Sequence, residues 1–558
     1  MGKLAPINGM SHVKGSTDDP LIDATIPQLV SQISAQHSSE TAVVFHEQGI
    51  RRSYAAFTQD IDALAHGLLD LGLVKGDRVG IWSPNRYEWV LTQFATARLG
   101  LVLVNINPAY RLNELEYALN KVECRALVTA QRFKSSDYLG MIQTLAPEIT
   151  TAHPGAWQAA RLPHLQMVIA MGETDIAGAI PFDSLMTNAA DTDALDAITD
   201  TLHPDDAINI QFTSGTTGRP KGATLTHRNI VNNAGFVTDR IKLGTGEGLC
   251  IPVPLYHCFG MVMGVLGALT KGATMVFPGE AFEPAATLET LEQENCVALY
   301  GVPTMFLAML QDLDSTGRDL SALRTGIMAG ALCPMEVMRA VQDKMGMHEL
   351  TICYGMTETA PVSFQSFTDD PVNKRCETVG RVHPHLEVKI VDPDGNTVPV
   401  GATGELCTKG YSVMQGYWGD AEKTADSIRD GWMMTGDLAF FDEEGYCTIN
   451  GRAKDMIIRG GENIYPREIE DFLMSHAEIS DAQVFGLPDE RFGEIVCAWV
   501  IPAAGHDLSE DQIKAMCKDQ IAHFKMPAHV RIVTEFPMTV TGKPQKFVMR
   551  DEMLAAKA

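Results

Sequence analysis

The chain has 558 residues, enough for roughly two to four domains, and its 45% hydrophobic and 20% charged content excludes wholesale disorder. The 70 acidic residues outnumber the 44 basic ones, and the formal net charge of −26 argues against a nucleic-acid-binding surface and against attraction to anionic lipid. The 11 cysteines include no C-x-x-C pair, so we interpret them mostly as reduced packing residues rather than a disulfide framework.

The N-terminal segment lacks the features of a targeting signal. It has no apolar core of the secretory type, Asp18 is acidic where a transit peptide would be basic, and Pro6 breaks the myristoylation pattern. The most apolar stretch, Ile251 to Leu269, contains Pro254 and His257, so we expect no stable membrane insertion. The cytoplasm is therefore the predicted compartment.

Alternating helices and strands are predicted through most of the chain. Apolar residues recur at helical spacing from Tyr54 to Leu71 and from Pro284 to Glu294. Short buried strands are expected in RALVTA from Arg125, in QMVIAM from Gln166, and in AINIQF from Ala207. This alternation predicts α/β layers with largely parallel sheets.

The C-terminal part follows a different pattern, typical of a compact α+β domain. A strand and turn are expected over 445–451, a helix beginning at Pro466, strands over 482–487 and 495–501, and a helix capped by Ser509 that runs to about Phe524. We place the domain boundary so that residues 1–452 form the first domain and 453–558 the second.

The sharpest local pattern is TSGTTGRPKG, Thr213 to Gly222, after a predicted strand. Glycines let the backbone approach a phosphate closely, hydroxyls and N–H groups donate to its oxygens, and Lys221 adds positive charge. A mobile Ser/Gly surface turn is the structural alternative. A Walker-type loop fails, because Pro220 stands at its second glycine and Gly222 at its Mg²⁺-binding hydroxyl.

TSGTTGRPKG resembles the phosphate-loop signature of the adenylate-forming superfamily. Further motifs follow in that family's order: PLYHCFG, AGALCP, YGMTE, TGD, GRAKD with RGGENIYP, and TGK. The resemblance is greatest to the medium-chain fatty acyl-CoA synthetase branch, chiefly in NIQFTSGTTG, GYWGD, KDMIIRGGENIYP and HFKMP. It implies a large N-terminal α/β domain of several subdomains and a small, mobile C-terminal α+β domain.

The resemblance also assigns roles to individual residues. ATP binding is assigned to Thr213, Ser214, Gly215, Thr216, Thr217, Gly218, Arg219, Pro220, Lys221, Gly330, Ala331, Tyr354, Asp437 and Arg452. The catalytic set is Lys543, Thr357, Glu358 and His257, with Glu358 as the Mg²⁺ ligand. The predicted acyl pocket is lined by His257, Phe259, Met261, Val302, Met328, Gly355 and Met356; Lys454 is the hinge, and Gly460 and Gly461 face CoA.

Several of these residues also have plainer interpretations. Asp437 is expected to accept hydrogen bonds from the ribose hydroxyls, although a turn-forming aspartate would have the same sequence. In the structural alternative, Arg452 would form a surface salt bridge and Glu358 would be a carboxylate at a helix start. His257 would be a core histidine, and Lys454 would be an ordinary exposed lysine.

Lys543 is the strongest catalytic candidate. Attack of a carboxylate on the α-phosphorus brings two anions together, and a positioned lysine offsets their repulsion in the transition state. A flexible tail lysine is the alternative, and the family pattern T-x-x-G-K decides against it. Pro544 departs from the aliphatic residue of many relatives, which leaves the local loop shape open.

The implied activity is an ATP-dependent carboxylic acid–CoA ligase that forms acyl-AMP and pyrophosphate and then a thioester. A medium-chain fatty acid fits the apolar pocket candidates; aromatic acids, short sulfur-containing acids and transfer to a carrier protein stay open. The implied co-substrates are ATP and CoA with Mg²⁺, and a homodimer stays open. A non-catalytic acyl- or nucleotide-binding protein would be expected to have lost one of Thr217, Glu358, Asp437 and Lys543, and all four are present.

Overall fold

The protein is described by a computed structural model over residues 4–186, 192–213, 220–331, 333–459, 462–489, 491–518, 520–521, 523–539 and 543–556. By contact density the chain divides into two compact units. Unit 1 comprises Met1–Ala5, Val13–Val388 and Thr408–Met433. Unit 2 comprises Pro6–His12, Lys389–Cys407 and Met434–Ala558, and each unit is described by itself.

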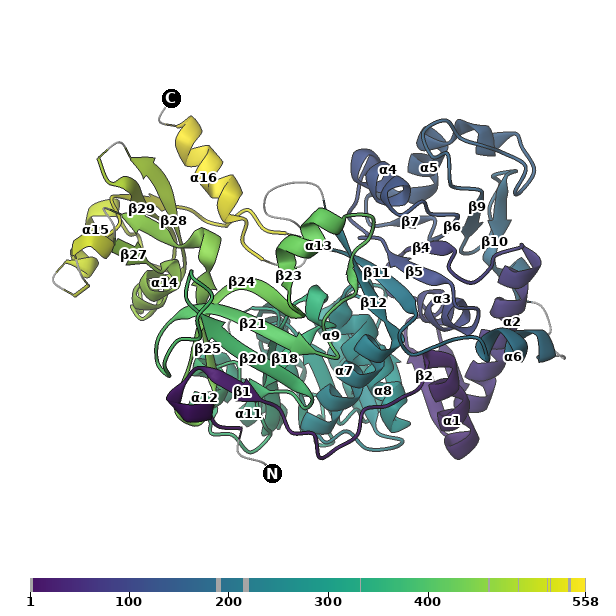
Figure 1. Ribbon diagram of the computed structural model, residues 1–558, viewed down its shortest axis with the longest axis horizontal. Helices are drawn as coiled ribbons and strands as arrows, with labels where there is room; N and C mark the ends of the chain where they lie inside the picture. Colours follow the sequence, from purple (N-terminus) through teal and green to yellow (C-terminus); the bar gives the residue numbers. More distant parts are fainter. Residues whose placement is uncertain are drawn as a thin grey trace. The chain divides into compact units, whose positions relative to one another are not determined.

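A nine-stranded, mostly parallel sheet forms one half of unit 1 (Figure 1). Its order is β19 (Arg381–Val382), β18 (Val362–Gln365), β17 (Glu349–Gly355), β16 (Thr325–Ala329), β15 (Ala298–Gly301), β13 (Gly248–Cys250), β14 (Thr274–Phe277), β2 (Thr41–Phe45) and β3 (Ile50–Ser53). The strands from β17 to β2 run parallel. Side chains alternate between faces, so Ile327 of β16 enters one apolar cluster and Met328 another.

An eight-stranded sheet forms the second half of unit 1. Its order is β10 (Ala179–Pro181), β9 (Met167–Ala170), β6 (Ala126–Thr129), β4 (Arg78–Trp82), β5 (Val102–Asn105), β11 (Ala207–Thr213), β12 (Lys221–Thr226) and β22 (Gly416–Tyr417). The strands are parallel as far as β11, and β12 and β22 are antiparallel. All four residues of β6 and of β9 are buried, as parallel strands covered on both faces require.

Helices connect and cover these strands. They are α1 (Ile26–His37), α2 (Tyr54–Asp70), α3 (Tyr87–Arg98), α4 (Leu112–Lys121), α5 (Tyr138–Leu145), α6 (Asp193–Thr199), α7 (His227–Arg240), the π-helix η4 (Phe259–Leu266), α8 (Gly267–Lys271), α9 (Pro284–Gln293), α10 (Pro303–Thr316), α11 (Met335–Met345), α12 (Val372–Glu377) and α13 (Ala421–Ser427). Local sequence sets their starts: Ser53 accepts the Ala56 N–H at 3.2 Å before α2, and α10 begins with a proline.

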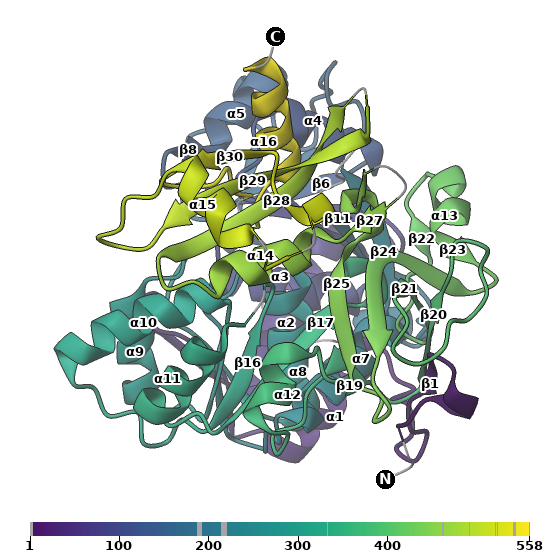
Figure 2. The same cartoon turned by 90° about the vertical axis from the view of Figure 1, so that its left-hand side faces the viewer.

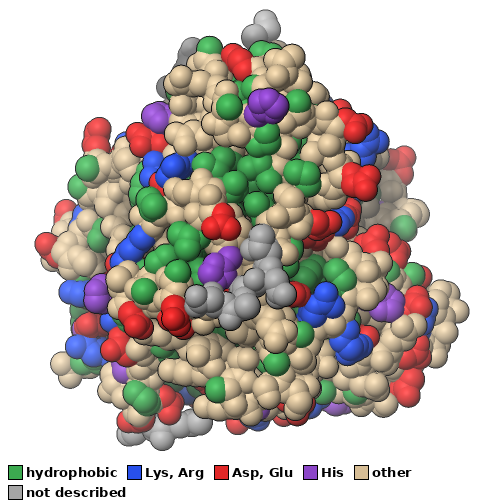
Figure 3. All heavy atoms as spheres, turned by 90° about the vertical axis from the view of Figure 1, so that its right-hand side faces the viewer, with side chains coloured by type: hydrophobic (Ala, Val, Ile, Leu, Met, Phe, Trp, Pro, Cys, Tyr) green, Lys and Arg blue, Asp and Glu red, His purple; other side chains and the backbone are tan. Residues whose placement is uncertain are grey.

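Every helix in the described ranges is too short or too polar to span a bilayer. Over the face seen in Figure 3, acidic and basic side chains are interspersed, and apolar side chains gather near the centre. The excess negative charge is therefore spread over this face rather than concentrated in one block.

A third sheet has the order β1 (His12–Lys14), β20 (Leu386–Val391), β21 (Gly404–Gly410), β24 (Trp432–Phe441) and β23 (Ile428–Arg429), with β25 (Cys447–Arg452) paired to β24. The unit boundaries fall inside β20, β21 and β24. Compactness thus groups residues 434–452 with the C-terminal part, whereas the predicted hinge after residue 452 stays a prediction.

The C-terminal part of unit 2 is built on a five-stranded sheet (Figure 2). Its strands are β27 (Glu462–Ile464), β26 (Ile457–Arg459), β29 (Gly493–Pro502), β28 (Ile479–Asp489) and β30 (His529–Ile532), and its helices are α14 (Pro466–Met474), α15 (Glu510–Cys517) and α16 (Lys546–Ala555). Both α14 and α16 contact β28. Val484 belongs to the apolar cluster that holds α14, and Phe485 to the cluster that holds α16, because successive side chains point to opposite faces.

The predicted α/β class and the C-terminal α+β domain are confirmed, and the predicted strands and helices occur close to their expected bounds. Pro466 is the first residue of α14 and Ser509 caps α15, as expected. The expected end of α15 near Phe524 is wrong. The helix ends at Cys517, because the backbone becomes extended at Lys518 (ψ 128°).

Candidate active site

A buried polar cluster in unit 1 ties three chain segments together beside the predicted phosphate loop. Glu358 lies in the turn Thr357–Thr359 directly after β17 and is 6% exposed. Its Oε1 accepts a hydrogen bond from Tyr417 Oη at 2.8 Å, and Lys221 Nζ donates to the same Tyr417 Oη at 3.2 Å. A carboxylate and an ammonium group are thus held on either side of one phenol, whose pKa is raised by burial and by Glu358.

The predicted phosphate loop connects two hydrogen-bonded strands. Thr213 at the end of β11 pairs with Lys221 at the start of β12 in antiparallel register. Because β12 follows the loop, the helix that a Walker site requires there is replaced by a strand. Pro220 accepts a hydrogen bond from Tyr117 Oη at 3.1 Å. The predicted ligands Ser214, Gly215, Thr216, Thr217, Gly218 and Arg219 lie outside the described residues.

The predicted adenine-binding residues lie at the carboxyl ends of the adjacent strands β16 and β17. Gly330 follows β16 with φ +89°, a conformation that favours glycine, and Ala331 beside it is exposed. Tyr354 near the end of β17 is half-buried, with its ring centroid 6.1 Å from that of Phe364. Carboxyl ends of parallel strands are where α/β sheets bind ligands, so this placement supports the predicted role.

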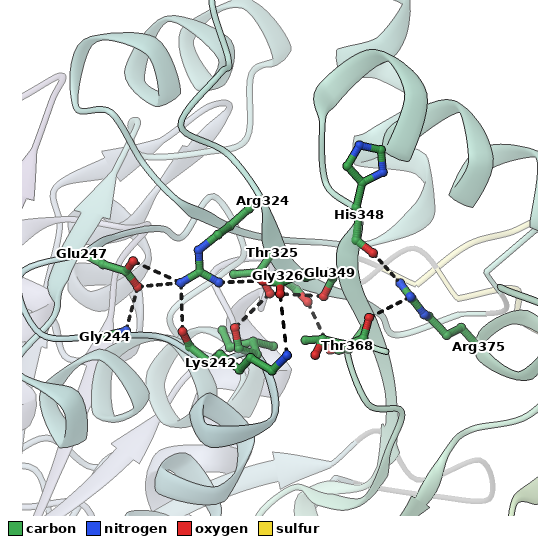
Figure 4. Close-up of polar contacts among 12 residues, drawn as sticks. Lys242, Gly244, Glu247, Arg324, Thr325, Gly326, His348, Glu349, Thr368 and Arg375 are labelled. Atoms are coloured by element: carbon green, nitrogen blue, oxygen red, sulfur yellow. Dashed lines mark hydrogen bonds and ion pairs between the residues drawn. The ribbon is translucent and has the colours of Figure 1, made fainter. Parts of the chain in front are cut away.

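Ion pairs and hydrogen bonds hold the amino ends of the same two strands (Figure 4). Arg324, just before β16, contacts Glu349 at 2.8 Å and Glu247 at 2.8 Å. The buried guanidinium of Arg375 donates to the carbonyl oxygens of His348 at 2.9 Å and Thr368 at 2.8 Å. These contacts fix β16 and β17 at the end opposite Gly330 and Tyr354. The sequence analysis did not identify them.

Most of the predicted acyl-pocket residues share one apolar cluster. Phe259 and Met261 are buried within it, and Val302 and Met356 pack against it. The Phe259 ring stacks on Tyr300, with centroids 5.5 Å apart. The half-buried His257 accepts the Phe259 N–H through Nδ1 at 3.1 Å, so part of its role is to begin the π-helix η4.

Two predicted pocket residues are placed differently. Met328 lies in the other apolar cluster, because strand alternation turns it to the opposite face from Ile327. Gly355 has no room for a side chain, since a Cβ there would lie 1.9 Å from the Pro361 carbonyl oxygen. Met328 therefore does not line the pocket together with the other candidates, and Gly355 is explained by close packing.

A polar layer underneath Met261 was missed by the sequence analysis. The amides of Asn105 and Gln211 approach Met261 Sδ at 3.2 and 3.0 Å, and Cys258 Sγ donates to Gln211 Oε1 at 3.1 Å. Burial raises the pKa of Cys258 to about 12, so this thiol stays protonated near neutral pH. Asn105 ends β5 and lies opposite Gln211 on the adjacent strand β11, a placement that no local motif marks.

The predicted ribose ligands in unit 2 pair with each other. Asp437 on β24 is 5% exposed and lies opposite Arg452 on β25, with an Arg452 Nε to Asp437 Oδ1 distance of 3.0 Å. Thr435 Oγ1 accepts the Asp437 N–H at 3.1 Å. The Arg452 side chain is 44% exposed, so it can turn toward a ligand while Asp437 stays fixed.

Lys543, in unit 2, is bonded to Thr539 through its backbone. Its carbonyl accepts the Thr539 N–H at 2.8 Å, and its N–H donates to Thr539 Oγ1 at 3.0 Å. The residue is exposed, as is Lys454 in the turn Ala453–Asp455. The predicted CoA-facing Gly460 and Gly461 lie outside the described residues.

Family models match most of the chain. The model of the AMP-binding enzyme matches residues 30–418, and that of the AMP-binding enzyme C-terminal domain matches residues 468–543. The chain is 47% identical over 547 residues to a zebrafish (Danio rerio) protein named medium-chain acyl-CoA ligase ACSF2, mitochondrial, covering 97% of this chain and 90% of the relative. It is 46% identical to the putative acyl-CoA synthetase YngI of Bacillus subtilis, covering 96% and 98%.

Several solved structures share this fold over nearly the whole chain. One is the anthranilate CoA ligase AuaEII in complex with anthranoyl-AMP, with a TM-score of 0.81, 26% identity and coverage of 97% of this chain and 99% of that one. Another is a Mycobacterium tuberculosis fatty acyl CoA synthetase, with a TM-score of 0.75, 27% identity and coverage of 95% and 99%. ATP-bound MatB from Rhodopseudomonas palustris matches with a TM-score of 0.78, 28% identity and coverage of 95% and 99%.

Proposed function

The chain belongs to the family of AMP-binding enzymes, and on that premise we propose that it is a medium-chain fatty acid–CoA ligase. The carboxylic acid reacts with ATP to give acyl-AMP and pyrophosphate, and CoA then displaces AMP from the acyl carbon. The observation that carries this proposal is the arrangement around Glu358 and Lys221, a buried carboxylate and an ammonium group beside the phosphate loop and next to an apolar cluster. The names of the relatives support the same reaction class.

An aliphatic acid fits the residues best. Phe259, Met261, Val302 and Met356 offer apolar contacts, and flexible methionines adapt to chains of different length. Aromatic acids remain the second candidate, because the anthranilate CoA ligase shares the fold over nearly its whole length.

The described residues have separate proposed roles in adenylation. Lys221 would contact phosphate oxygens and Tyr354 the adenine, while Asp437 and Arg452 would bind the ribose. Lys543 would offset the charge that gathers as the acid's carboxylate approaches the α-phosphate.

Glu358 suits a Mg²⁺ ion, because this hard cation is usually held by one or two carboxylates plus substrate phosphates. Its Oε1 is oriented by Tyr417 Oη, as ligating carboxylates commonly are. When bound, Mg²⁺ would neutralise phosphate charge.

Residues 453–558 are proposed to move as one domain about Lys454. This movement would exchange Lys543 for the segment at Gly460 and Gly461, where absent side chains leave room for the pantetheine arm of CoA. The family match to residues 468–543 as a separate domain supports this proposal. Limited proteolysis in the presence of ATP or of CoA would test it: a cleavage pattern near residue 454 that neither ligand changes would contradict the hinge.

The proposed compartment is the cytoplasm and a homodimer stays open, although several vertebrate relatives are named as mitochondrial. Fractionation of the source cells would decide the compartment, and light scattering the oligomeric state.

The decisive experiment measures pyrophosphate release with Mg²⁺ and ATP across straight-chain acids of graded length and benzoate, with and without CoA. We expect a maximum at medium chain length, acyl-AMP without CoA and acyl-CoA with it. A maximum with benzoate would favour the aromatic alternative. Folded protein that binds ATP but releases no pyrophosphate with any acid would favour the non-catalytic binding protein.

A further inference from the structure

A buried ion pair connects the helix that follows Lys543 to the centre of the same unit. Lys546, the first residue of α16, places its Nζ 2.5 Å from Oε1 of Glu470 on α14. The Glu470 side chain is 6% exposed and that of Lys546 22%. Charged groups are seldom buried without a partner, and this pair gives each a charge-assisted hydrogen bond.

Glu470 is itself held by the sheet. The same Oε1 accepts the Val484 N–H of β28 at 2.8 Å, so the carboxylate joins α14, β28 and α16 at one point. Val484 is fully buried in the apolar cluster between α14 and the sheet. The carboxylate therefore presents a fixed anchor rather than a mobile surface charge.

The chain between this anchor and Lys543 is short and closed by hydrogen bonds. Lys543 and Thr539 bond to each other twice, and the Gln545 N–H donates to the Pro537 carbonyl at 2.8 Å. Only Pro544 and Gln545 separate Lys543 from Lys546. Three residue steps of extended chain span at most about 11 Å, so a displacement of Lys546 is passed to Lys543 with little slack.

Apolar packing and exposed ion pairs also hold α16. Met549 is fully buried in a cluster with Phe485, Leu487 and Trp499, whereas Phe547 is 49% exposed. Two further ion pairs of α16, Arg531 to Glu552 at 3.2 Å and Arg550 to Glu494 at 3.9 Å, join side chains whose exposed fractions are 26–48%, so water screens them. Lys546–Glu470 differs in having a buried carboxylate, and together with Met549 it fixes the first turn of α16.

We propose that Lys546 and Glu470 are positioning residues for adenylation, which fix the first turn of α16 so that Lys543 is held in one position. The inference rests on the proposed function, since it assigns the pair an effect on acyl-AMP formation through Lys543. Catalytic contributions of this kind are sensitive to position, because a displacement of 1 Å can cost on the order of 10²-fold in rate.

The test compares the two half-reactions in the full-length chain. Lys546→Met is expected to slow acyl-AMP formation by about 10-fold to 10²-fold, and thioester formation from supplied acyl-AMP and CoA by less than about 2-fold. Lys546→Arg should recover most of the rate, because it keeps the charge. Arg531→Met removes the exposed ion pair to the same helix and should leave both half-reactions near the wild-type rates.

A second comparison separates positioning from general stability. Lys546→Met leaves Glu470 buried and unpaired, so the chain with both Glu470→Met and Lys546→Met replaces the pair with apolar groups and should fold. This double variant is expected to show the same selective loss of adenylation. Combined with Lys543→Ala, Lys546→Met should lower the residual adenylation rate no further, because its effect runs through Lys543.

The outcomes separate a failure of the proposed function from a failure of the positioning role. Wild-type protein that forms no acyl-AMP with any acid would overturn the proposed function. Active wild-type protein in which Lys546→Met slows both half-reactions equally, or adds its full effect to Lys543→Ala, would overturn the positioning role and leave the reaction class intact.

Discussion

Glu358 and Lys543 serve the same proposed reaction and are built in opposite ways. Glu358 is buried at the end of a parallel strand, with its carboxylate bonded to Tyr417 Oη at 2.8 Å. Lys543 is exposed in unit 2, and the contacts described for it are backbone bonds to Thr539. The difference suggests that the nucleotide side is fixed by the sheet, while the lysine is placed by its loop and by the helix behind it.

Removing the lysine should have the largest effect. We expect Lys543→Ala to lower the rate of acyl-AMP formation by about 10²-fold or more, as for other losses of transition-state charge stabilisation, with little change in the KM for ATP. Single-turnover formation of acyl-AMP is the measurement. Lys514→Ala, which removes a lysine from a partly exposed pair with Glu510, is the matched control and should keep the wild-type rate.

Neutralising the buried carboxylate of Glu358 should lower the rate of acyl-AMP formation less than removing Lys543 does. In Glu358→Gln the amide oxygen can still accept the Tyr417 hydrogen bond, so the fold should persist. We expect adenylation to fall by about 10- to 10²-fold and more Mg²⁺ to be needed for half-maximal rate, because a neutral amide is a weaker ligand. An unchanged Mg²⁺ dependence would contradict the metal role of Glu358.

The close packing at the end of β17 predicts a stability effect. A Cβ at position 355 would lie 1.9 Å from a backbone oxygen, so Gly355→Ala should lower the free energy of unfolding by about 1–3 kcal/mol or more. Urea denaturation measures it. Gly248→Ala is the control, because the atoms nearest to its Cβ would be those of Cys296 at 3.4 Å, an ordinary van der Waals distance.

A buried histidine in unit 1 predicts a pH effect of about 2 kcal/mol at pH 5. Burial lowers the pKa of His227 from its ordinary value of 6.5 to about 3, and its Nδ1 accepts the Ile26 N–H at 3.1 Å. Below pH 6.5 His227 is protonated in the unfolded chain but stays neutral in the folded chain. The free energy of unfolding therefore falls as the pH falls toward 3.

The His227→Asn variant keeps an acceptor and removes the titration. The difference in unfolding free energy between pH 7 and pH 5 should shrink by about 2 kcal/mol relative to wild type. Equal pH dependence in the two proteins would show that His227 is protonated in the folded chain or contributes nothing to the pH dependence of stability.

Much of the site could be predicted because motifs mark it locally. The loop after β11, the tyrosine near the end of β17, the glutamate after that strand and the lysine before α16 were all identified from short patterns, and the family assignment is confirmed. The wrong end of α15 was a local failure, since propensity alone does not show that the backbone turns extended at Lys518.

Residues that act through tertiary contacts could not be predicted. Tyr417 is 59 positions from Glu358, and Glu470 is 76 positions from Lys546, so no short pattern connects them. Met328 was predicted to line the pocket, but strand alternation turns it to the opposite face from Ile327. Pairing of Asp437 with Arg452 likewise depends on the register of β24 and β25.

The central claim is that Lys543 serves the first half-reaction and not the second. The most direct measurement supplies preformed medium-chain acyl-AMP and CoA to wild-type protein and to Lys543→Ala, and follows acyl-CoA formation in a single turnover. The account predicts nearly equal rates for the two proteins, even though the variant is impaired in making acyl-AMP. A loss of about 10²-fold in thioester formation would contradict it, because the lysine would then act on both steps or on the fold itself.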